Sequence, residues 1–199
     1  MSLVNRFLFA FLAFGLPVFA GSPSGIRNFD QVDAHVYRGG QPTEEGFQYL
    51  AQLGVKTVID LRETGYRSIG ERRMVTQAGM TYVNVPMTRF KPPTDAEISK
   101  ILGMLEDGTS GSVFVHCRRG ADRTGVVIAT YRIDHDKWDN SRALKDALAH
   151  GMSFFQVQRQ KYIKNFRPHT VQANTNSPVP AAAVAPAPVA APAAAGVQN

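Results

Sequence analysis

The amino-acid sequence predicts an α/β domain with a central, mainly parallel sheet flanked by helices. Short β-branched runs alternate with longer segments in which apolar residues recur every three or four positions. The chain has 199 residues, 44% of them hydrophobic, which suits one domain with a buried core. Its single cysteine excludes an internal disulfide and any zinc site built from several thiolates. The net charge of +6 favours anionic partners, and no basic tail points to nucleic acid.

The two ends of the chain differ in composition from its middle. Residues 1–20 resemble a secretory signal, with Arg6 as the only charge, an apolar run and small residues up to Ala20. The run is short beside the roughly 20 residues of a membrane span, so we expect cleavage and export to a periplasm or beyond, with a retained anchor as the alternative. Residues 170–199 carry neither charge nor aromatic ring and predict a disordered Ala/Pro-rich tail. The domain is then expected at 21–169.

Strands and helices are expected to alternate through the first half of the domain. A short strand at 36–38 leads into Gly39, and a helix begins near Pro42 and ends before Gly54. Thr94 and Glu97 form a Thr-x-x-Glu capping box, which marks the start of another helix. The other expected elements are strands at 55–61 and 81–85, a helix at 70–77 and the body of the capped helix up to residue 105.

The second half is expected to contain one more strand and several helices. The apolar run at 112–116 predicts a buried strand, and residues 124–134 predict the helix that follows it. One or two further helices follow, and no internal repeat is apparent. The residues expected to face inward from these last helices are Ala143, Leu144, Ala147, Leu148, Tyr162, Ile163 and Phe166.

The segment that carries chemistry lies between this strand and this helix. It reads His116-Cys117-Arg118-Arg119-Gly120-Ala121-Asp122-Arg123-Thr124. The cysteine stands at the carboxyl end of a strand, the edge at which open α/β sheets bind ligands. Backbone N–H groups of such a loop, at a helix N-terminus, can hold a tetrahedral oxyanion. The same positive field is expected to lower the pKa of Cys117 from about 8.5 to roughly 4–7.

Each polar residue of this loop has an expected role. Cys117 is the candidate nucleophile, and its alternative is a small thiol buried in the core. Arg123 can bind two phosphate oxygens at once as charge spreads in the transition state. Thr124 offers a hydroxyl to the sulfur when the sulfur leaves, and His116 is expected to order the loop, not to bind metal. The remaining candidates for substrate binding are Arg118, Arg119, Gly120 and Ala121.

The loop resembles the His-Cys-x₅-Arg-Ser/Thr signature of the cysteine-dependent protein tyrosine phosphatase superfamily. The segments 37–42 and 58–62 are similar to segments of bacterial and plant-fungal dual-specificity-like phosphatases, so the resemblance extends over most of 34–167. It implies the compact dual-specificity phosphatase fold. It also implies hydrolysis of a phosphomonoester through a phosphocysteine, without a metal or an organic cofactor.

The resemblance also implies a general acid, for which the sequence offers several carboxylates. The spacing Cys-x-x-Gly-x-Asp-Arg-Thr is similar to the loop of myotubularin-type lipid phosphatases and some secreted bacterial tyrosine phosphatases, which implies Asp122. Most of the superfamily keeps its acid on an upstream loop, where this chain has Arg89 at the matching spacing and Asp95 further on. Asp122 has an alternative role as a helix N-cap and Asp95 as a first-turn carboxylate. Asp60 is a third candidate.

The expected substrate is a phosphorylated protein, with phosphotyrosine as the default. Arg118 and Arg119 beside Arg123 favour, as the alternative, an inositol polyphosphate or phosphoinositide. A catalytically silent phosphate-binding module is the alternative of another class. Residues 89–91 are expected to form a rim that faces the substrate, and Arg62 is expected to hold the loop in place.

Overall fold

The computed structural model of the chain describes residues 25–168. The proposed signal at 1–20 and the Ala/Pro-rich tail at 170–199 lie outside these residues, and the boundaries of 21–169 remain a prediction. No helix within the described range is long and apolar enough to cross a membrane.

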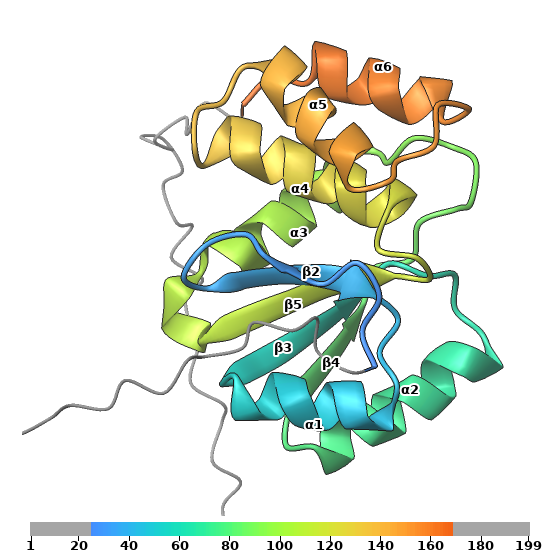
Figure 1. Cartoon of the computed structure of the whole chain (residues 1–199), viewed down its shortest axis with the longest axis vertical. Helices are drawn as coiled ribbons and strands as arrows, with labels where there is room; N and C mark the ends of the chain where they lie inside the picture. Colours follow the sequence, from blue (N-terminus) through green and yellow to red (C-terminus); the bar gives the residue numbers. More distant parts are fainter. Residues whose placement is uncertain (1–24, 169–199) are drawn as a thin grey trace, which may run out of the picture. The chain divides into compact units, whose positions relative to one another are not determined.

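A five-stranded sheet forms the centre of the domain and confirms the predicted mainly parallel architecture (Figure 1). Its order is β1-β2-β5-β3-β4, and only β1 runs antiparallel to its neighbour. The two-residue β1 is too short to leave a pattern in the sequence. The strands are β1 (Asp30–Gln31), β2 (Val36–Gly40), β3 (Val55–Asp60), β4 (Thr81–Asn84) and β5 (Ser112–Cys117).

Helices cover both faces of this sheet. Figure 1 shows α1 and α2 below the sheet and α3, α4, α5 and α6 above it. The helices are α1 (Glu44–Gln52), α2 (Tyr66–Gln77), α3 (Asp95–Glu106), α4 (Asp122–Asp134), α5 (Asn140–Ala149) and α6 (Val157–Asn165), with a short 3₁₀ turn at Gly108–Ser110.

Three details differ from the sequence predictions. Helix α2 begins at Tyr66, before the expected residue 70, because the Ser68 hydroxyl accepts from the Gly65 N–H at 2.9 Å and so supports an earlier start. Helix α4 begins at Asp122 instead of Thr124. Leu148 was expected to face inward, but it is exposed near the end of α5, where the helix face turns away from the core.

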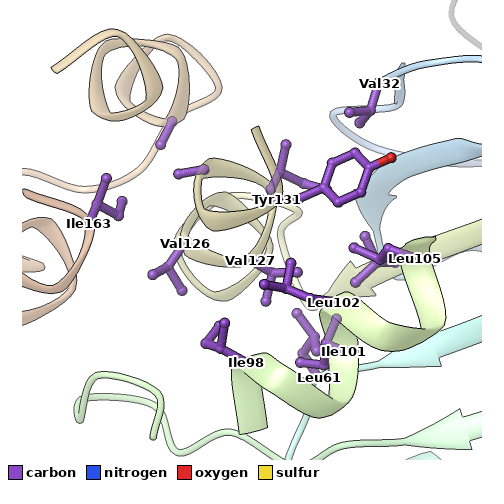
Figure 2. Close-up of a cluster of buried hydrophobic side chains, with 14 of the residues drawn as sticks. Val32, Leu61, Ile98, Ile101, Leu102, Leu105, Val126, Val127, Tyr131 and Ile163 are labelled. Atoms are coloured by element: carbon purple, nitrogen blue, oxygen red, sulfur yellow. The ribbon is translucent and has the colours of Figure 1, made fainter. Parts of the chain in front are cut away.

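Helix α4 is the central helix of the upper layer. It is buried along most of its length because α3, α5, α6 and the sheet surround it (Figure 2). Val126 and Val127 of α4 pack in one apolar cluster with Ile98 and Ile101 of α3 and Ile163 of α6. Each such side chain contributes about 1.5–3 kcal/mol when fully buried. The loop before α4 is therefore attached to the most firmly packed helix of the domain.

Strand β5 lies in the middle of the sheet and carries Cys117 at its carboxyl end. Its parallel neighbours end beside it, with Gly40 of β2 paired with Cys117 and Asp60 of β3 paired with His116. The residues that follow these strands therefore meet at one edge of the sheet, where ligand sites of open α/β folds form.

Candidate active site

Residues 117–123 form a loop in which two carbonyl groups, those of Arg118 and Gly120, bond to groups outside the loop. The carbonyl oxygen of Gly120 accepts hydrogen bonds from Arg38 Nη2 and Asn28 Nδ2, both at 2.9 Å. The N–H of Gln41 approaches the carbonyl oxygen of Arg118 at 3.4 Å. With these oxygens directed outward, the loop N–H groups are available to an anion at the centre.

Gly120 meets a steric requirement of this loop. Its φ of +71° lies in the left-handed region. A Cβ at this position would also stand 2.4 Å from the carbonyl carbon of Gly39 in β2. Any larger residue would therefore push the loop away from β2 and from the side chain of Arg38.

Cys117 is buried at the base of the loop and has an activated thiol. Burial by itself raises the pKa of the thiol, but interactions with the hydroxyl and the N–H of Thr124 lower it. The charge of Arg123 and the N–H of Arg119 act in the same direction. The net effect holds the pKa of Cys117 below its ordinary value, as the sequence predicted, and favours the nucleophilic thiolate.

The depressed pKa predicts alkylation of Cys117 by iodoacetamide below the ordinary thiol range. The thiolate fraction, and so the alkylation rate, is expected to titrate with a midpoint below about 8.5. Thr124→Val keeps the side-chain volume but removes the hydroxyl, so its midpoint should move upward. A wild-type midpoint at or above about 8.5 would contradict this assignment.

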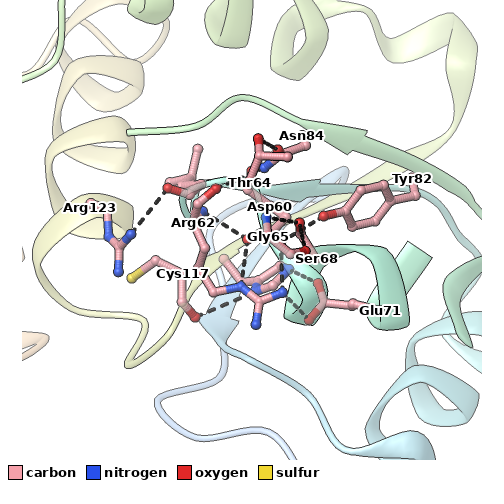
Figure 3. Close-up of polar contacts among 12 residues, drawn as sticks. Asp60, Arg62, Thr64, Gly65, Ser68, Glu71, Tyr82, Asn84, Cys117 and Arg123 are labelled. Carbon is pink, nitrogen blue, oxygen red and sulfur yellow. Dashed lines mark hydrogen bonds and ion pairs between the residues drawn. The ribbon is translucent and has the colours of Figure 1, made fainter. Parts of the chain in front are cut away.

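Arg123 is aimed at the same point as the thiolate. Figure 3 shows its guanidinium beside the sulfur of Cys117. Its Nη1 lies 3.4 Å from the carbonyl oxygens of both Leu61 and Met87, which follow β3 and β4. These contacts orient the guanidinium so that its fork can bind two oxygens of a phosphate.

A cavity of about 440 Å³ opens above the loop and has a strongly basic wall. Six arginines but only two carboxylates contribute to it. The lining residues are Gln41, Arg62, Glu63, Arg67, Ser68, Arg89, Phe90, Cys117, Arg118, Arg119, Asp122, Arg123, Ser153 and Gln156. Arg89 and Phe90 of the predicted rim are among them, whereas Lys91 is not.

Asp122 lies in the cavity wall, where a general acid is needed. It is the first residue of α4, and Ala121 occupies the N-cap position that was the alternative for Asp122. Its Oδ1 accepts from the Ser153 N–H at 2.9 Å, and its Oδ2 accepts from Arg119 Nη2 at 2.5 Å. These contacts hold the carboxylate within the loop that surrounds Cys117.

The structure does not bring the other candidate acids to Cys117. Asp95 is the first residue of α3, accepts from the Tyr162 hydroxyl at 2.7 Å, and lines a different cavity of about 500 Å³ beside α6. Asp60 is fully buried and pairs with Arg62 at 2.7 Å. The placement of Asp95 agrees with its alternative role as a first-turn carboxylate. Of the three candidate acids, Asp122 is the one that lines the cavity containing Cys117.

Several cavity residues were missed by the sequence analysis. Glu63 and Arg67 follow the carboxyl end of β3, so the rule that ligands bind at this edge could have indicated them. Ser153 and Gln156 come from the loop between α5 and α6, which has no such signal. Arg159 joins α6 to the segment between β4 and α3, since its guanidinium donates to the carbonyl oxygens of Thr88 at 2.6 Å and Arg89 at 2.9 Å.

Asp60, Arg62 and Glu71 (Figure 3) form a buried ionic cluster with His116, the residue that precedes Cys117. Arg62 Nη2 lies 2.7 Å from Asp60 Oδ2 and 2.6 Å from Glu71 Oε2, and His116 Nε2 lies 2.8 Å from Glu71 Oε1. Burial lowers the pKa of His116, but the charge and hydrogen bond of Glu71 outweigh it and raise that pKa. His116 is thus fixed directly before Cys117, as expected, whereas Arg62 reaches the start of the loop through Glu71.

The same cluster contains donor atoms of the kind that bind metal ions. Ligand atoms of Asp60, Glu71 and His116 lie within 4.8 Å of one another. Arg62, however, already forms ion pairs with both carboxylates. A cation would have to displace a guanidinium that these contacts already hold, so the arrangement fits structural support of the loop better than a metal site.

Comparison with known proteins agrees with this geometry. Residues 20–165 match a family described as "DSP-PTPase phosphatase fused to NAD+ Kinase". The chain belongs to this family. It is therefore a member of the cysteine-dependent phosphatase superfamily that its loop sequence resembles.

Individual relatives of this DSP-PTPase chain cover most of the described domain. This chain is 30% identical over 131 residues to the dual specificity protein phosphatase TpbA of Pseudomonas aeruginosa. The match covers 65% of this chain and 57% of that relative. A crystal structure of P. aeruginosa TpbA in complex with pTyr has a TM-score of 0.61 and 25% identity, covering 72% of this chain and 91% of the other. The catalytic core of the S. cerevisiae PP-IP phosphatase SIW14 shares the fold, with a TM-score of 0.63 at 22% identity, covering 71% and 86%.

Proposed function

We propose that this protein is a phosphomonoester hydrolase that acts through a phosphocysteine on Cys117. The observation that carries the proposal is the thiol of lowered pKa beside Arg123, at the base of a basic cavity. Membership of the DSP-PTPase family and the similarity to TpbA support it.

The reaction proceeds in two displacements at phosphorus. The Cys117 thiolate attacks in line and forms an S–P bond, while the bond from phosphorus to the leaving oxygen breaks and that oxygen takes a proton from Asp122. Arg123 and the loop N–H groups stabilise the equatorial oxygens. A water molecule then gives its proton to Asp122, forms the new P–O bond and releases phosphate and the thiolate.

Asp122→Asn is expected to lower turnover of a phosphotyrosine peptide by about 10²–10⁴-fold. With p-nitrophenyl phosphate, whose leaving group needs little protonation, the variant should give a burst of p-nitrophenol equal to the enzyme concentration. Slow turnover should follow, because the phosphocysteine lacks its base. Glu63→Gln is the matched control, since Glu63 is the other carboxylate in the cavity wall. Loss in Glu63→Gln with normal turnover in Asp122→Asn would assign the acid to Glu63.

Phosphotyrosine is the substrate that we propose first, and an inositol polyphosphate is the second candidate. The similarity to TpbA, which has been crystallised with pTyr, supports the first. The six arginines of the cavity wall support the second, because several phosphate groups could be bound at once.

Phosphate release from a phosphotyrosine peptide and from inositol hexakisphosphate tests this choice. We expect the peptide to have the higher kcat/KM, and Arg67→Gln to lower it by less than about threefold, because the loop alone holds a single phosphate. A faster reaction with inositol hexakisphosphate, and a loss of about tenfold in Arg67→Gln, would instead support the second candidate. Phosphate binding without release from either compound would indicate a silent binding module.

We also propose that the protein is exported. Support comes only from the sequence of residues 1–20, with its single charge, short apolar run and small residues up to Ala20. The new N-terminus of the protein from a periplasmic or secreted fraction should follow Ala20. An intact first segment in the membrane fraction would indicate a retained anchor.

A further inference from the structure

Most large apolar side chains that are exposed on the described residues belong to the segments that line one cavity. Seven are exposed within residues 25–168: Tyr66, Ile69, Phe90, Leu148, Phe154, Phe155 and Val157. All except Leu148 either line the cavity above Cys117 or directly adjoin a lining residue in sequence. We name these six side chains the apolar rim.

The rim comes from three segments that converge at the carboxyl edge of the sheet. They are the start of α2, the segment between β4 and α3, and the loop between α5 and α6, and Figure 1 shows all three at the same end of the domain. Tyr66, Phe90, Phe154 and Phe155 are 77%, 73%, 72% and 78% exposed. Side chains of this size are rarely left in water together without a partner.

Positive charge accompanies the rim. The Arg67 guanidinium lies 5.5 Å from the centre of the Tyr66 ring, and the Arg89 guanidinium lies 5.3 Å from that of Phe90. Both arginines also line the cavity, as do the exposed Arg118 and Arg119. Aromatic rings next to arginines, around a cationic hollow, match the chemistry of an anionic lipid surface, which offers apolar depth and negative headgroups together.

We propose that the apolar rim docks on an anionic phospholipid bilayer, so that the cavity receives the phosphomonoester of a lipid headgroup. The substrate part of this proposal rests on the phosphomonoester hydrolysis proposed for Cys117, and it adds a lipid headgroup to phosphotyrosine as a further substrate class. Phe154 and Phe155 would enter the interface between headgroups and acyl chains, while the arginines contact headgroup phosphates. The chemistry at phosphorus is unchanged, and the leaving oxygen belongs to the lipid.

The apolar rim fits a lipid bilayer better than a peptide. Its side chains project outward from three separate segments, and the hollow between them is lined by arginines. A peptide that bound by its apolar residues would need an apolar groove to receive them. Binding to a bilayer requires only aromatic side chains that can insert between the lipids and cationic side chains close to them.

Vesicle sedimentation tests the docking without relying on catalysis. Phosphatidylglycerol is anionic, but its phosphodiester is not a substrate of a phosphomonoester hydrolase. Vesicles of phosphatidylcholine with or without phosphatidylglycerol therefore serve as the probe. We expect binding to the mixed vesicles only, weakened by salt, and reduced about tenfold or more in Phe154→Ser/Phe155→Ser. Leu148→Ser is the matched control, because Leu148 is exposed but outside the rim. Equal binding of the double variant and the wild type, or no binding of the wild type, would overturn the proposal.

Activity measurements separate this proposal from the proposed function. Release from soluble p-nitrophenyl phosphate reports the chemistry alone and should be unchanged in the double variant, which also shows that the variant is folded. If it is not folded, the two single variants take its place, with an expected loss of vesicle binding of about threefold each. Release from phosphatidic acid in vesicles should fall in parallel with binding. If the double variant instead loses activity on an apolar phosphotyrosine peptide and keeps vesicle binding, the rim binds peptides and the proposal is wrong.

Discussion

Replacing Cys117 by serine is expected to abolish phosphate release, with a loss in kcat of about 10⁴-fold or more. The serine hydroxyl stays protonated under conditions in which the Cys117 pKa, lowered by Thr124 and Arg123, leaves a thiolate. Because Arg123 and the loop N–H groups remain, binding of inorganic phosphate or vanadate should be retained. Phosphate release in rapid-quench assays, together with calorimetric titration of vanadate, measures the two effects separately.

Thermal unfolding is the control for this variant. The side chain is small and fully enclosed, so Cys117→Ser should unfold within a few degrees of the wild type. Turnover at even a tenth of the wild-type rate would exclude the thiolate as nucleophile. Alkylation of the wild type with iodoacetamide should reproduce the loss of activity, since Cys117 is the single cysteine of the chain.

The second large effect is expected at Glu71, which does not line the cavity but contacts Arg62 and His116 behind it. Glu71→Gln removes the charge that faces both Arg62, at 2.6 Å, and His116, at 2.8 Å. The cluster is buried, and in the variant only Asp60 remains to balance the charges of Arg62 and protonated His116, so the protein should lose about 3–5 kcal/mol of unfolding free energy. Urea denaturation measures this loss. Glu106→Gln, at an exposed position of α3, should change the free energy by less than about 0.5 kcal/mol.

The pH dependence of stability distinguishes this ion pair from simple packing. Glu71 raises the pKa of His116 in the folded protein. The stabilisation by the Glu71–His116 ion pair is therefore fully present below pH 6.5, which is about the pKa of His116 in the unfolded chain. It is lost as the pH rises through the pKa of His116 in the folded protein. This alkaline decline should be absent in Glu71→Gln. An identical pH profile in both proteins would show that the charge of His116 does not stabilise the fold.

The parts of the site that could be predicted are those in which neighbours in sequence are neighbours in space. A strand, a loop and a helix place Cys117 and Arg123 within one short segment, so their convergence follows from local geometry. Asp95 and Asp122 could not be separated in this way, because the hydrogen bond from Tyr162 of α6 to Asp95 of α3 joins residues far apart in the sequence. The pairing of Glu71 with His116 joins α2 to β5 across a long stretch of chain, and neither residue carries a sign of its partner.

The sequence predictions that were wrong at the helices failed because they, too, depend on contacts between distant segments. Leu148 has the apolar character of a core residue, but it lies near the end of α5, where the core no longer covers the helix. Glu63 and Arg67 contact the cavity because of the turn between β3 and α2, whose earlier helix start depends on the bonds between Gly65 and Ser68. Burial and the ends of helices depend on tertiary packing, which periodicity alone does not contain.

The anchoring of the Gly120 carbonyl by Asn28 and Arg38 makes catalysis a property of the whole sheet. Cys117 and Arg123 belong to one segment of the sequence. The shape of the loop between them nevertheless depends on Asn28 and Arg38, which come from the N-terminal part of the domain. A fragment that begins after β2 would retain the nucleophile and the arginine but lose the groups that keep the loop open. The appearance of activity during refolding would therefore report the docking of β2 on β5, and an enzyme assay could follow that step of folding.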